Sequence, residues 1–497
     1  MTLLGQLTTQ IQRRQATHIV MITFWSQFAA FAFNTIFILF LTRPIAMHGL
    51  GYSQGKAYAF IGIYNATGYL TPILGGAIAD KVLGLRRSIL LAGFLLAFAY
   101  LLLILSEYTL TTRGDILFLA AIAAIPAANS LLMGTASALI SKIYSSNAVK
   151  AKAAMTYYYL AINLGGLLAT FIAPTLFDSH YGALSVFALA FAGKAIAALN
   201  FAYRYSIYDS IASGPDKEPL TAKRVLRVIA YLIALYAFAL TALLHIHFFS
   251  MIITTGCLLG IGWFLITTSL LKPHTRTKQF IALLLTIEAI VFFVIYNQMN
   301  TTLILFALNN STNQLFGLTL SPAHYQVLNP LLIIILGLQL PRFYKRFPRF
   351  SIPYQFACGT LLAGIALLTL ALAPSMHQDG MISAYVIAFT YILISLAELW
   401  VSAIGLSMIG LYCDQKTLGF AMGIWYLACS LSNTISGRIS QWVAIPEGTT
   451  NPIHSLAMYQ HYYQHMSIAA CLIAGVMVFI AYQLHARLDK KTPNVLV

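Results

Sequence analysis

Long apolar runs of the length that a bilayer requires dominate the chain. Residues 88–106 contain no charged side chain, and residues 228–271 contain none apart from histidines. A helix needs about 20 apolar residues to cross the hydrocarbon core, and both runs are long enough. Transmembrane β-barrels show short segments of alternating hydrophobicity instead. The pattern therefore predicts an all-α integral membrane protein.

The apolar runs divide the chain into about fourteen transmembrane helices. The predicted spans are 18–43, 55–80, 88–106, 115–144, 151–175, 182–206, 227–246, 249–271, 279–309, 322–342, 352–374, 380–412, 417–444 and 464–487. The polar stretch 206–227 contains Gly214, Pro215 and Pro219 and is typical of a linker. We therefore expect an N-terminal six-helix bundle at 1–207, a linker and inserted transmembrane hairpin at 208–278, and a C-terminal six-helix bundle at 279–497.

Composition and charge support a membrane location. Hydrophobic residues make up 59% of the 497 positions and charged residues 8%, against about 25% charged residues in soluble domains. If both termini are cytoplasmic, only Arg43, Lys56 and Arg113 fall in loops on the opposite side. This asymmetry follows the positive-inside rule and predicts a multi-pass membrane protein with both termini in the cytoplasm. Basic loops beside anionic lipid also explain the net charge of +16, so we expect a lipid partner and no nucleic acid.

No residue constellation indicates catalysis or a cofactor. The chain has no serine–histidine–aspartate set, zinc-protease motif or phosphate-binding glycine loop, and its five cysteines are scattered. His454, His461 and His465 could form a metal site, because the last two are four residues apart. We favour an outer-loop and interface aromatic belt, formed with Tyr459, Tyr462 and Tyr463. The chain is thus predicted to be no enzyme and to hold no cofactor or metal.

A glycine-rich segment with charges at a helix end is the first strong motif. Residues 75–87 read Gly-Gly-Ala-Ile-Ala-Asp-Lys-Val-Leu-Gly-Leu-Arg-Arg. The glycines let two helices approach closely, and an inter-helix ion pair among Asp80, Arg86 and Arg87 could latch one conformation. The segment resembles the signature loop between helices two and three of major-facilitator proteins.

Further segments narrow the resemblance to one family. Residues 157–166 read Tyr-Tyr-Tyr-Leu-Ala-Ile-Asn-Leu-Gly-Gly, residues 296–302 read Tyr-Asn-Gln-Met-Asn-Thr-Thr, and residues 397–406 read Ala-Glu-Leu-Trp-Val-Ser-Ala-Ile-Gly-Leu. They are similar to helices five, seven and ten of the proton-dependent oligopeptide transporters. The resemblance runs in order from about residue 18 to 487 and implies a major-facilitator fold with two six-helix bundles and an inserted hairpin.

The resemblance also implies a central cavity that binds the amino terminus of a peptide. Its lining would be Tyr69, Tyr159, Asn163, Asn329, Glu398 and Ser402. Further substrate-binding candidates are Gln27, Asn34, Asn297, Gln298 and Trp425. Glu398 is independently notable, because a carboxylate in a membrane helix costs several kcal/mol unless it serves a polar cavity.

The chain departs from the family where the family is charged. Thr23, Ser26 and Gln27 stand in place of the helix-one Glu-x-x-Glu-Arg motif, Met133 in place of a lysine, and Asn297 in place of an acid. Neutralising a whole buried network costs far less than removing one partner, so we interpret the changes as a concerted loss. The ligand would then carry an amine and no free carboxylate.

Proton coupling would rest on Glu398, with Glu288 as a second candidate. Three other charges lie within apolar surroundings, Lys194, Glu288 and Arg438, and we expect the two basic side chains to snorkel or to find partners.

The expected function is secondary active transport of di- or tripeptides, or of peptide-like amines, by alternating access. A proton-independent facilitator or exporter of another small organic solute is the alternative within transport. A transport-dead sensor that binds its ligand without flux is the alternative outside it. We expect the protein to be a monomer whose partners are its small-molecule substrate, protons and the lipid bilayer.

Overall fold

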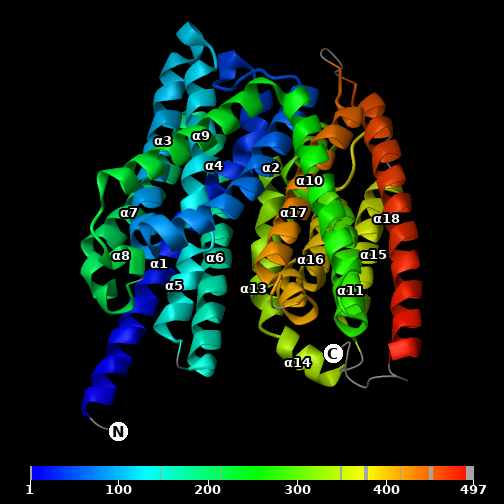
Figure 1. The fold of residues 1–497 in the computed structure, drawn as a ribbon. Helices are drawn as coiled ribbons and strands as arrows, with labels where there is room; N and C mark the ends of the chain where they lie inside the picture. Colours follow the sequence, from blue (N-terminus) through cyan, green and yellow to red (C-terminus); the bar gives the residue numbers. More distant parts are fainter. Residues whose placement is uncertain are drawn as a thin grey trace. The chain divides into compact units, whose positions relative to one another are not determined.

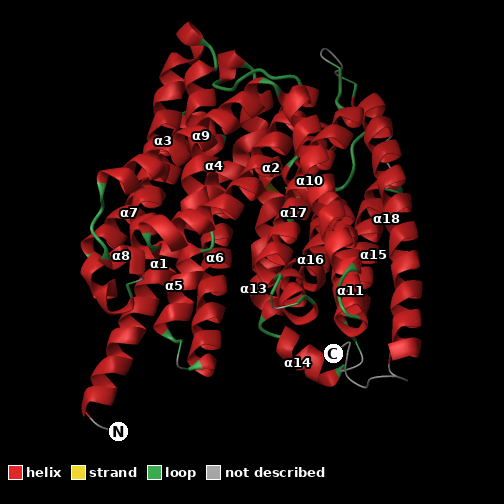
Figure 2. Cartoon of the chain, viewed as in Figure 1, coloured by secondary structure: helices red, strands yellow, loops and turns green. Residues whose placement is uncertain are grey.

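The computed structural model describes residues 3–145, 147–212, 214–347, 350–373, 379–414, 416–446 and 451–488. These residues are almost entirely helical (Figure 2). Twelve of the described helices are long and apolar enough to cross a membrane, or thirteen if the bent pair Pro322–Gly337 and Leu340–Arg346 forms one span. Helix α2 (Gln54–Ile78) adds another of sufficient length. The all-α membrane architecture and the count of about fourteen helices are confirmed.

The chain forms two compact units (Figure 1). Unit 1 comprises Met1–Gly51 and Thr67–Ile246. In it α1 packs against α6 and α7, and α3 packs against α4 and α7. Its helices, besides the second half of α2, are α1 (Leu3–Thr42), α3 (Leu85–Arg113), α4 (Ile116–Leu132), α5 (Thr135–Ile143), α6 (Ala148–Phe177), α7 (Gly182–Tyr203), α8 (Gly214–Lys217) and α9 (Ala222–Leu244).

Unit 2 comprises Tyr52–Ala66 and His247–Val497. In it α15 packs against α16 and α18, and α11 packs against α17. Its helices are α10 (Ile246–Ser269), α11 (Pro273–Tyr296), α12 (Thr302–Asn310), α13 (Leu328–Gly337), α14 (Leu340–Arg346), α15 (Ile352–Ala371), α16 (Ala384–Tyr412), α17 (Leu418–Ser440) and α18 (Pro452–Leu488). A small hairpin pairs β1 (Gln314–Leu315) with β2 (Leu318–Thr319).

The two helices of the predicted hairpin pack in different units. Helix α9 lies against α4 in unit 1. Helix α10 lies against α17 in unit 2, where the Phe264 and Phe420 rings are 5.7 Å apart. The predicted division at residues 207 and 278 remains a prediction.

The first half of α2 packs closely on α17 within unit 2. A Cβ on Gly62 would lie 2.9 Å from the Gly437 Cα, and a Cβ on Gly437 would lie 3.0 Å from the Gly62 Cα. Ser430 of α17 also donates a hydrogen bond of 3.0 Å to the Ala66 carbonyl. Glycine on both helices therefore permits a backbone approach that any side chain would prevent.

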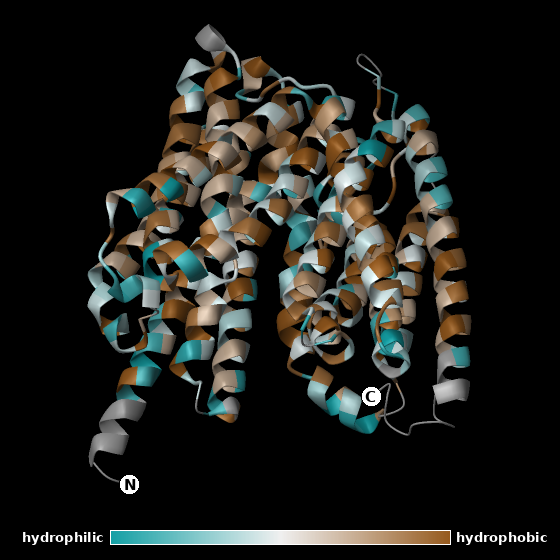
Figure 3. Ribbon diagram, in the orientation of Figure 1, coloured by the Kyte–Doolittle hydropathy of each residue, from teal (hydrophilic) through white to brown (hydrophobic). Residues whose placement is uncertain are grey.

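Three predicted spans are broken or bent in the structure. The span 115–144 is split at Met133 and Gly134, where Gly134 has a φ of 87°. The span 279–309 consists of α11 and α12 joined by the 3₁₀ turn Asn297–Asn300. The span 322–342 is bent by 52° before α14. Helix α14 is mostly polar, whereas the middle of α18 is apolar (Figure 3).

Candidate functional site

Glu398 lies on α16 and is held by a neighbouring helix of unit 2. The Asn329 Nδ2 of α13 donates to Glu398 Oε2 at 2.6 Å and to the Ser395 Oγ at 3.2 Å. The Tyr296 side chain at the end of α11 is also hydrogen-bonded to Glu398. Three helices therefore position a half-buried carboxylate that accepts hydrogen bonds from Asn329 and Tyr296.

No basic side chain pairs with Glu398 among the described residues. The four ion pairs there all lie in unit 1. A carboxylate inside a membrane helix costs several kcal/mol without a cation or a proton. The site can therefore accept an ammonium group or take up a proton.

Two other predicted site residues, Ser402 and Asn297, are neighbours in sequence of residues that form this site. Ser402 is half-buried and follows Glu398 by one helical turn, on the same face of α16. Asn297 directly follows Tyr296, and its Nδ2 is buried without a hydrogen-bond partner among the described residues. Asn297 thus has an amide donor that no described group uses.

Gln298 and Trp425 have surroundings typical of structural residues. Trp425 is buried, and its ring packs against Phe293 and Phe356 and fills the space beside Gly405. Gln298 is fully buried, and its amide is saturated by hydrogen bonds. Its Nε2 donates to Ser436 at 2.9 Å and to the Val294 carbonyl, and its Oε1 accepts from Thr302, Ser440 and Tyr462. These contacts favour a role in helix packing over substrate binding.

The remaining substrate-binding candidates lie in unit 1. Tyr159 and Asn34 are exposed, and Tyr69 and Gln27 are half-buried. Asn163 is buried, and its Nδ2 donates to the Tyr159 carbonyl of its own helix at 3.0 Å. A single cavity lined from both units remains a prediction.

The serine at the substituted helix-one position has an unexpected partner. Ser26 accepts a hydrogen bond of 2.9 Å from the Nζ of Lys194, a residue of α7 whose exposure is 5%. Of the two expected arrangements, snorkelling or a partner, Lys194 thus has a partner, which is a neutral hydroxyl and not an acid of the described chain. The reason is its position, because the amine points at α1 inside the helix bundle of unit 1.

The two other unexplained charges differ from each other. Arg438 is exposed in the last turn of α17, as a snorkelling side chain would be. Glu288 of α11 is 2% exposed, and neither of its carboxylate oxygens has a hydrogen-bond partner among the described residues. The hydroxyl of Thr360 on α15 interacts with this carboxylate without the geometry of a full hydrogen bond. Glu288 is thus a second unpaired acid in unit 2.

Arg86 and Arg87 bind the linker in unit 1. The Arg86 guanidinium lies 2.6 Å from the Asp209 carboxylate and 4.2 Å from the centre of the Tyr205 ring. Arg87 donates to the carbonyls of Pro215 and Glu218, at 2.9 Å each. Asp80 is exposed and makes no ion pair among the described residues. Arg86 and Arg87 thus anchor the linker, and the acid that pairs with Arg86 is Asp209 instead of Asp80.

The same linker is anchored on α1. The Gln15 Nε2 donates to the Ile207 carbonyl at 2.5 Å and to the Ser210 Oγ at 3.1 Å. Tyr208 is fully buried there, and burial raises the pKa of its hydroxyl. The start of the predicted linker is therefore a docked segment.

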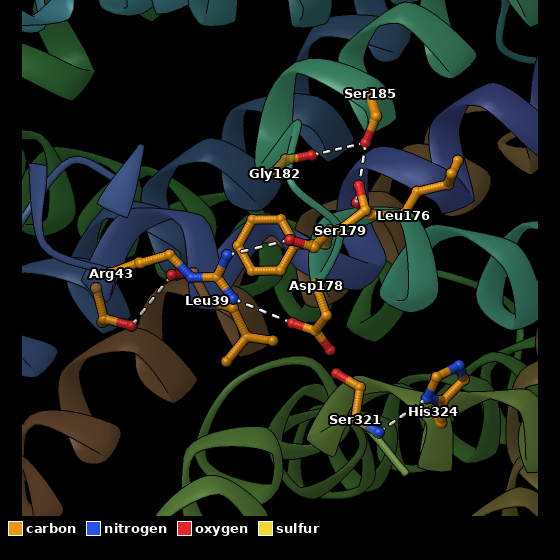
Figure 4. A network of polar contacts seen from close by, with 11 residues as sticks. Leu39, Arg43, Leu176, Asp178, Ser179, Gly182, Ser185, Ser321 and His324 are labelled. Atoms are coloured by element: carbon orange, nitrogen blue, oxygen red, sulfur yellow. Dashed lines mark hydrogen bonds and ion pairs between the residues drawn. The ribbon is translucent and has the colours of Figure 1, made fainter. Parts of the chain in front are cut away.

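Arg43 ties the end of α1 to the turn between α6 and α7 (Figure 4). Its guanidinium donates to the Phe177 carbonyl at 3.1 Å, pairs with Asp178 at 3.1 Å and covers the Phe177 ring at 3.7 Å. Separately, in unit 2, the Ser321 amide donates to His324 in a capping box that begins the 3₁₀ turn before α13.

The histidine cluster is neither a metal site nor an aromatic belt in the described chain. His454, His461 and His465 are exposed on α18, and no group of three potential metal ligands occurs among the described residues. The belt interpretation is wrong, because its tyrosines are buried inside unit 2. Tyr462 donates to Gln298, Tyr463 donates to Thr302, and Tyr459 is hydrogen-bonded to Tyr58.

Sequence reasoning missed Ser395 and Tyr296 as partners in the acid site. Ser395 precedes Glu398 by three positions on α16, so helical spacing alone could have identified it. Tyr296 is the first residue of the recognised motif 296–302. Its contact with Glu398 depends on where α11 ends, which the sequence alone does not show.

Known proteins resemble the chain along almost its whole length. A model of the POT family matches residues 86–456. Dipeptide and tripeptide permease A of Klebsiella pneumoniae (strain 342) is 32% identical over 467 residues, which cover 93% of this chain and 91% of that protein. The permease of the same name from Escherichia coli (strain K12) is 32% identical over 470 residues, with the same coverage.

Solved structures share the fold. A bacterial homologue of the human drug peptide transporters PepT1 and PepT2 matches with a TM-score of 0.82 at 26% identity, over 96% of this chain and 99% of that one. Tetrameric PepTSo2 matches with a TM-score of 0.83 at 26% identity and the same coverage. These likenesses confirm the expected major-facilitator architecture. The chain belongs to the POT family of membrane transporters.

Proposed function

We propose that the protein is a secondary active transporter of di- and tripeptides, or of peptide-like amines, in the bacterial inner membrane. The Asn329–Glu398 pair supports this proposal most directly, because it presents a carboxylate with no competing cation among the described residues. The curated relatives named above are dipeptide and tripeptide permeases. We place both termini in the cytoplasm and take one chain as the working unit.

The geometry suggests how an amine would be held. The ammonium group of the ligand would donate to Glu398, while Asn329 keeps the carboxylate oriented. Charge-assisted hydrogen bonds of this kind are about twice as strong as neutral ones. The unused Asn297 donor could then contact an acceptor on the ligand.

Glu398 is also the proposed proton carrier, with Glu288 as a second one. A proton that crosses the membrane potential contributes about 2.3 kcal/mol per 100 mV. Both acids lack a basic partner among the described residues, so each would be more stable inside the membrane with a proton bound.

The test replaces the acid and measures uptake into proteoliposomes. We expect Glu398→Gln to abolish the response of uptake to an imposed pH gradient and to weaken binding by about 100-fold, because one charge-assisted contact to an amine is lost. Ser407→Ala is the control on the same helix, since Ser407 is exposed and bonds only its own backbone. Full retention of the pH response in Glu398→Gln would refute the role.

The neutral helix-one positions predict a preference among ligands. Thr23, Ser26 and Gln27 carry no charge that could hold a peptide carboxylate. A dipeptide amide should therefore bind at least as tightly as the free dipeptide in a thermal-shift titration. A clear preference for the free acid would contradict this ligand class while leaving the amine site at Glu398 untouched.

A further inference from the structure

Lys194 is a buried amine without a counter-charge. It lies near the middle of α7, and its side chain is 5% exposed. The Nζ donates to Ser26 at 2.9 Å, and the Tyr100 ring centre of α3 lies 5.9 Å away. No acidic side chain forms an ion pair with it among the described residues. A charged ammonium group has three hydrogens to satisfy, and only one of them has a partner here.

The walls around the amine are apolar. Lys194 lines a small cavity with room for at most one water molecule. Apart from Ser26 of α1, the residues that line it with Lys194 have no polar side chain: Ile22, Ile89, Gly93, Leu96, Leu132, Ala197, Ala198 and Phe201. Among the helices packed against α7, α1 thus contributes Ser26, α3 contributes the Tyr100 ring, and α6 contributes no lining residue.

This environment suits a neutral amine and disfavours a charged one. An isolated ammonium in such surroundings loses its hydration with no carboxylate to replace it. A neutral amine needs no counter-charge, and the Ser26 hydroxyl already accepts one of its N–H groups. A purely structural role would be served as well by an apolar side chain of the same length, so the lysine needs another explanation.

The helices on both sides of this amine approach each other closely. Gly193 lets α7 lie close to α1, because a Cβ there would be 3.0 Å from the Trp25 carbonyl oxygen. On the α3 side, a Cβ on Gly93 would be 3.1 Å from the Ala198 Cβ. The contacts on both sides of α7 are therefore tight in the structure.

We propose that Lys194 is a proton-binding site inside unit 1, neutral in the present arrangement and protonated when the seam between α1 and α7 admits water. In that step the amine lone pair binds a proton from a hydronium ion, which leaves as water, and the Ser26 hydroxyl, already the acceptor, accepts from the new ammonium group. Protonation would thus favour a looser packing of α7. This site is separate from the acids of unit 2.

The first experiment follows thermal unfolding of the purified full-length protein between about pH 5 and pH 9. Protonating the buried amine should destabilise the folded state, so the wild-type Tm should fall toward acid pH. Lys194→Met should lose most of that slope. Ser26→Glu should lose it as well, because it supplies a counter-charge, and this variant keeps the test intact if Lys194→Met fails to fold.

The matched control is Lys152→Met, which removes an exposed lysine from α6 of the same unit and should keep the wild-type slope. Equal slopes in wild type, Lys194→Met and Ser26→Glu would overturn the proposal.

A second measurement tests the movement of α7. At acid pH, amide hydrogen exchange in peptides covering 186–200 should be faster in the wild type than in Lys194→Met, and the difference should vanish at alkaline pH. Comparing variants at one pH cancels the intrinsic pH dependence of exchange. Identical exchange in both proteins at acid pH would exclude the opening. Neither readout depends on transport, so both remain valid if the role of Glu398 is refuted.

Discussion

Single buried polar residues in this protein fall into two kinds, and their partners distinguish them. Gln298 has every hydrogen-bonding position filled by neighbouring side chains or backbone. Glu288 and Lys194 have one partner or none among the described residues. Saturated groups stabilise a packing arrangement, whereas unsatisfied ones are costly and are kept where they bind something.

Replacing Gln298 should therefore harm stability before it affects ligand binding. Gln298→Leu would leave several buried hydroxyls without a partner, at about 1–3 kcal/mol for each group that finds no substitute. We expect a loss of about 3 kcal/mol, seen as a lower Tm in detergent. Gln464→Leu on α18 is the control, since Gln464 is exposed. Unchanged stability with lost ligand binding would instead place Gln298 in the substrate site.

At the scale of elements, the basic end of the α2–α3 loop organises the linker. Gly84 has a φ of 90° and immediately precedes α3. Arg86 and Arg87, in the first turn of α3, then project toward the linker. Arg86 is buried beneath Tyr205, whereas the side chain of Asp209 is 68% exposed. Arg86 also donates a hydrogen bond of 3.4 Å to the Tyr205 carbonyl. The ring contact and this carbonyl bond should therefore contribute more than the exposed ion pair, which solvent screens.

Two substitutions separate these contributions. We expect Arg86→Ala to destabilise the protein by about 2 kcal/mol, because it removes the ring contact, the carbonyl bond and the ion pair together. Asp209→Asn should cost less than about 1 kcal/mol. Proteolysis of 205–221 should accelerate in Arg86→Ala and stay near wild-type rates in Asp209→Asn. The reverse order would show that the ion pair dominates.

At the scale of the whole molecule, the two units carry different buried charge. All four ion pairs of the described chain lie in unit 1, which also holds Lys194. The deeply placed charges of unit 2 are the unpaired acids Glu288 and Glu398. Acids without cations attract amines and protons, so the proposed ligand chemistry belongs to unit 2. The proposed amine site in unit 1 responds to protons alone.

The membrane class, the helix count and the family could all be predicted from the amino-acid sequence. Helix length and hydropathy are local properties, and motifs such as 397–406 survive in linear order. The importance of Glu398 also followed from its position inside an apolar run.

Which side chains contact one another depends on how the helices pack in three dimensions. Asn329 and Glu398 are 69 positions apart, Gln298 and Tyr462 are 164 apart, and Ser26 and Lys194 are 168 apart. A helical pattern states which face a residue occupies but not which helix lies opposite. That choice depends on close packing between distant segments, such as Gly62 on Gly437. Long-range packing therefore distinguishes Gln298, whose hydrogen bonds are all made within the protein, from Glu398, which is available to a ligand. It also gives Lys194 a serine, Ser26, as its hydrogen-bond partner.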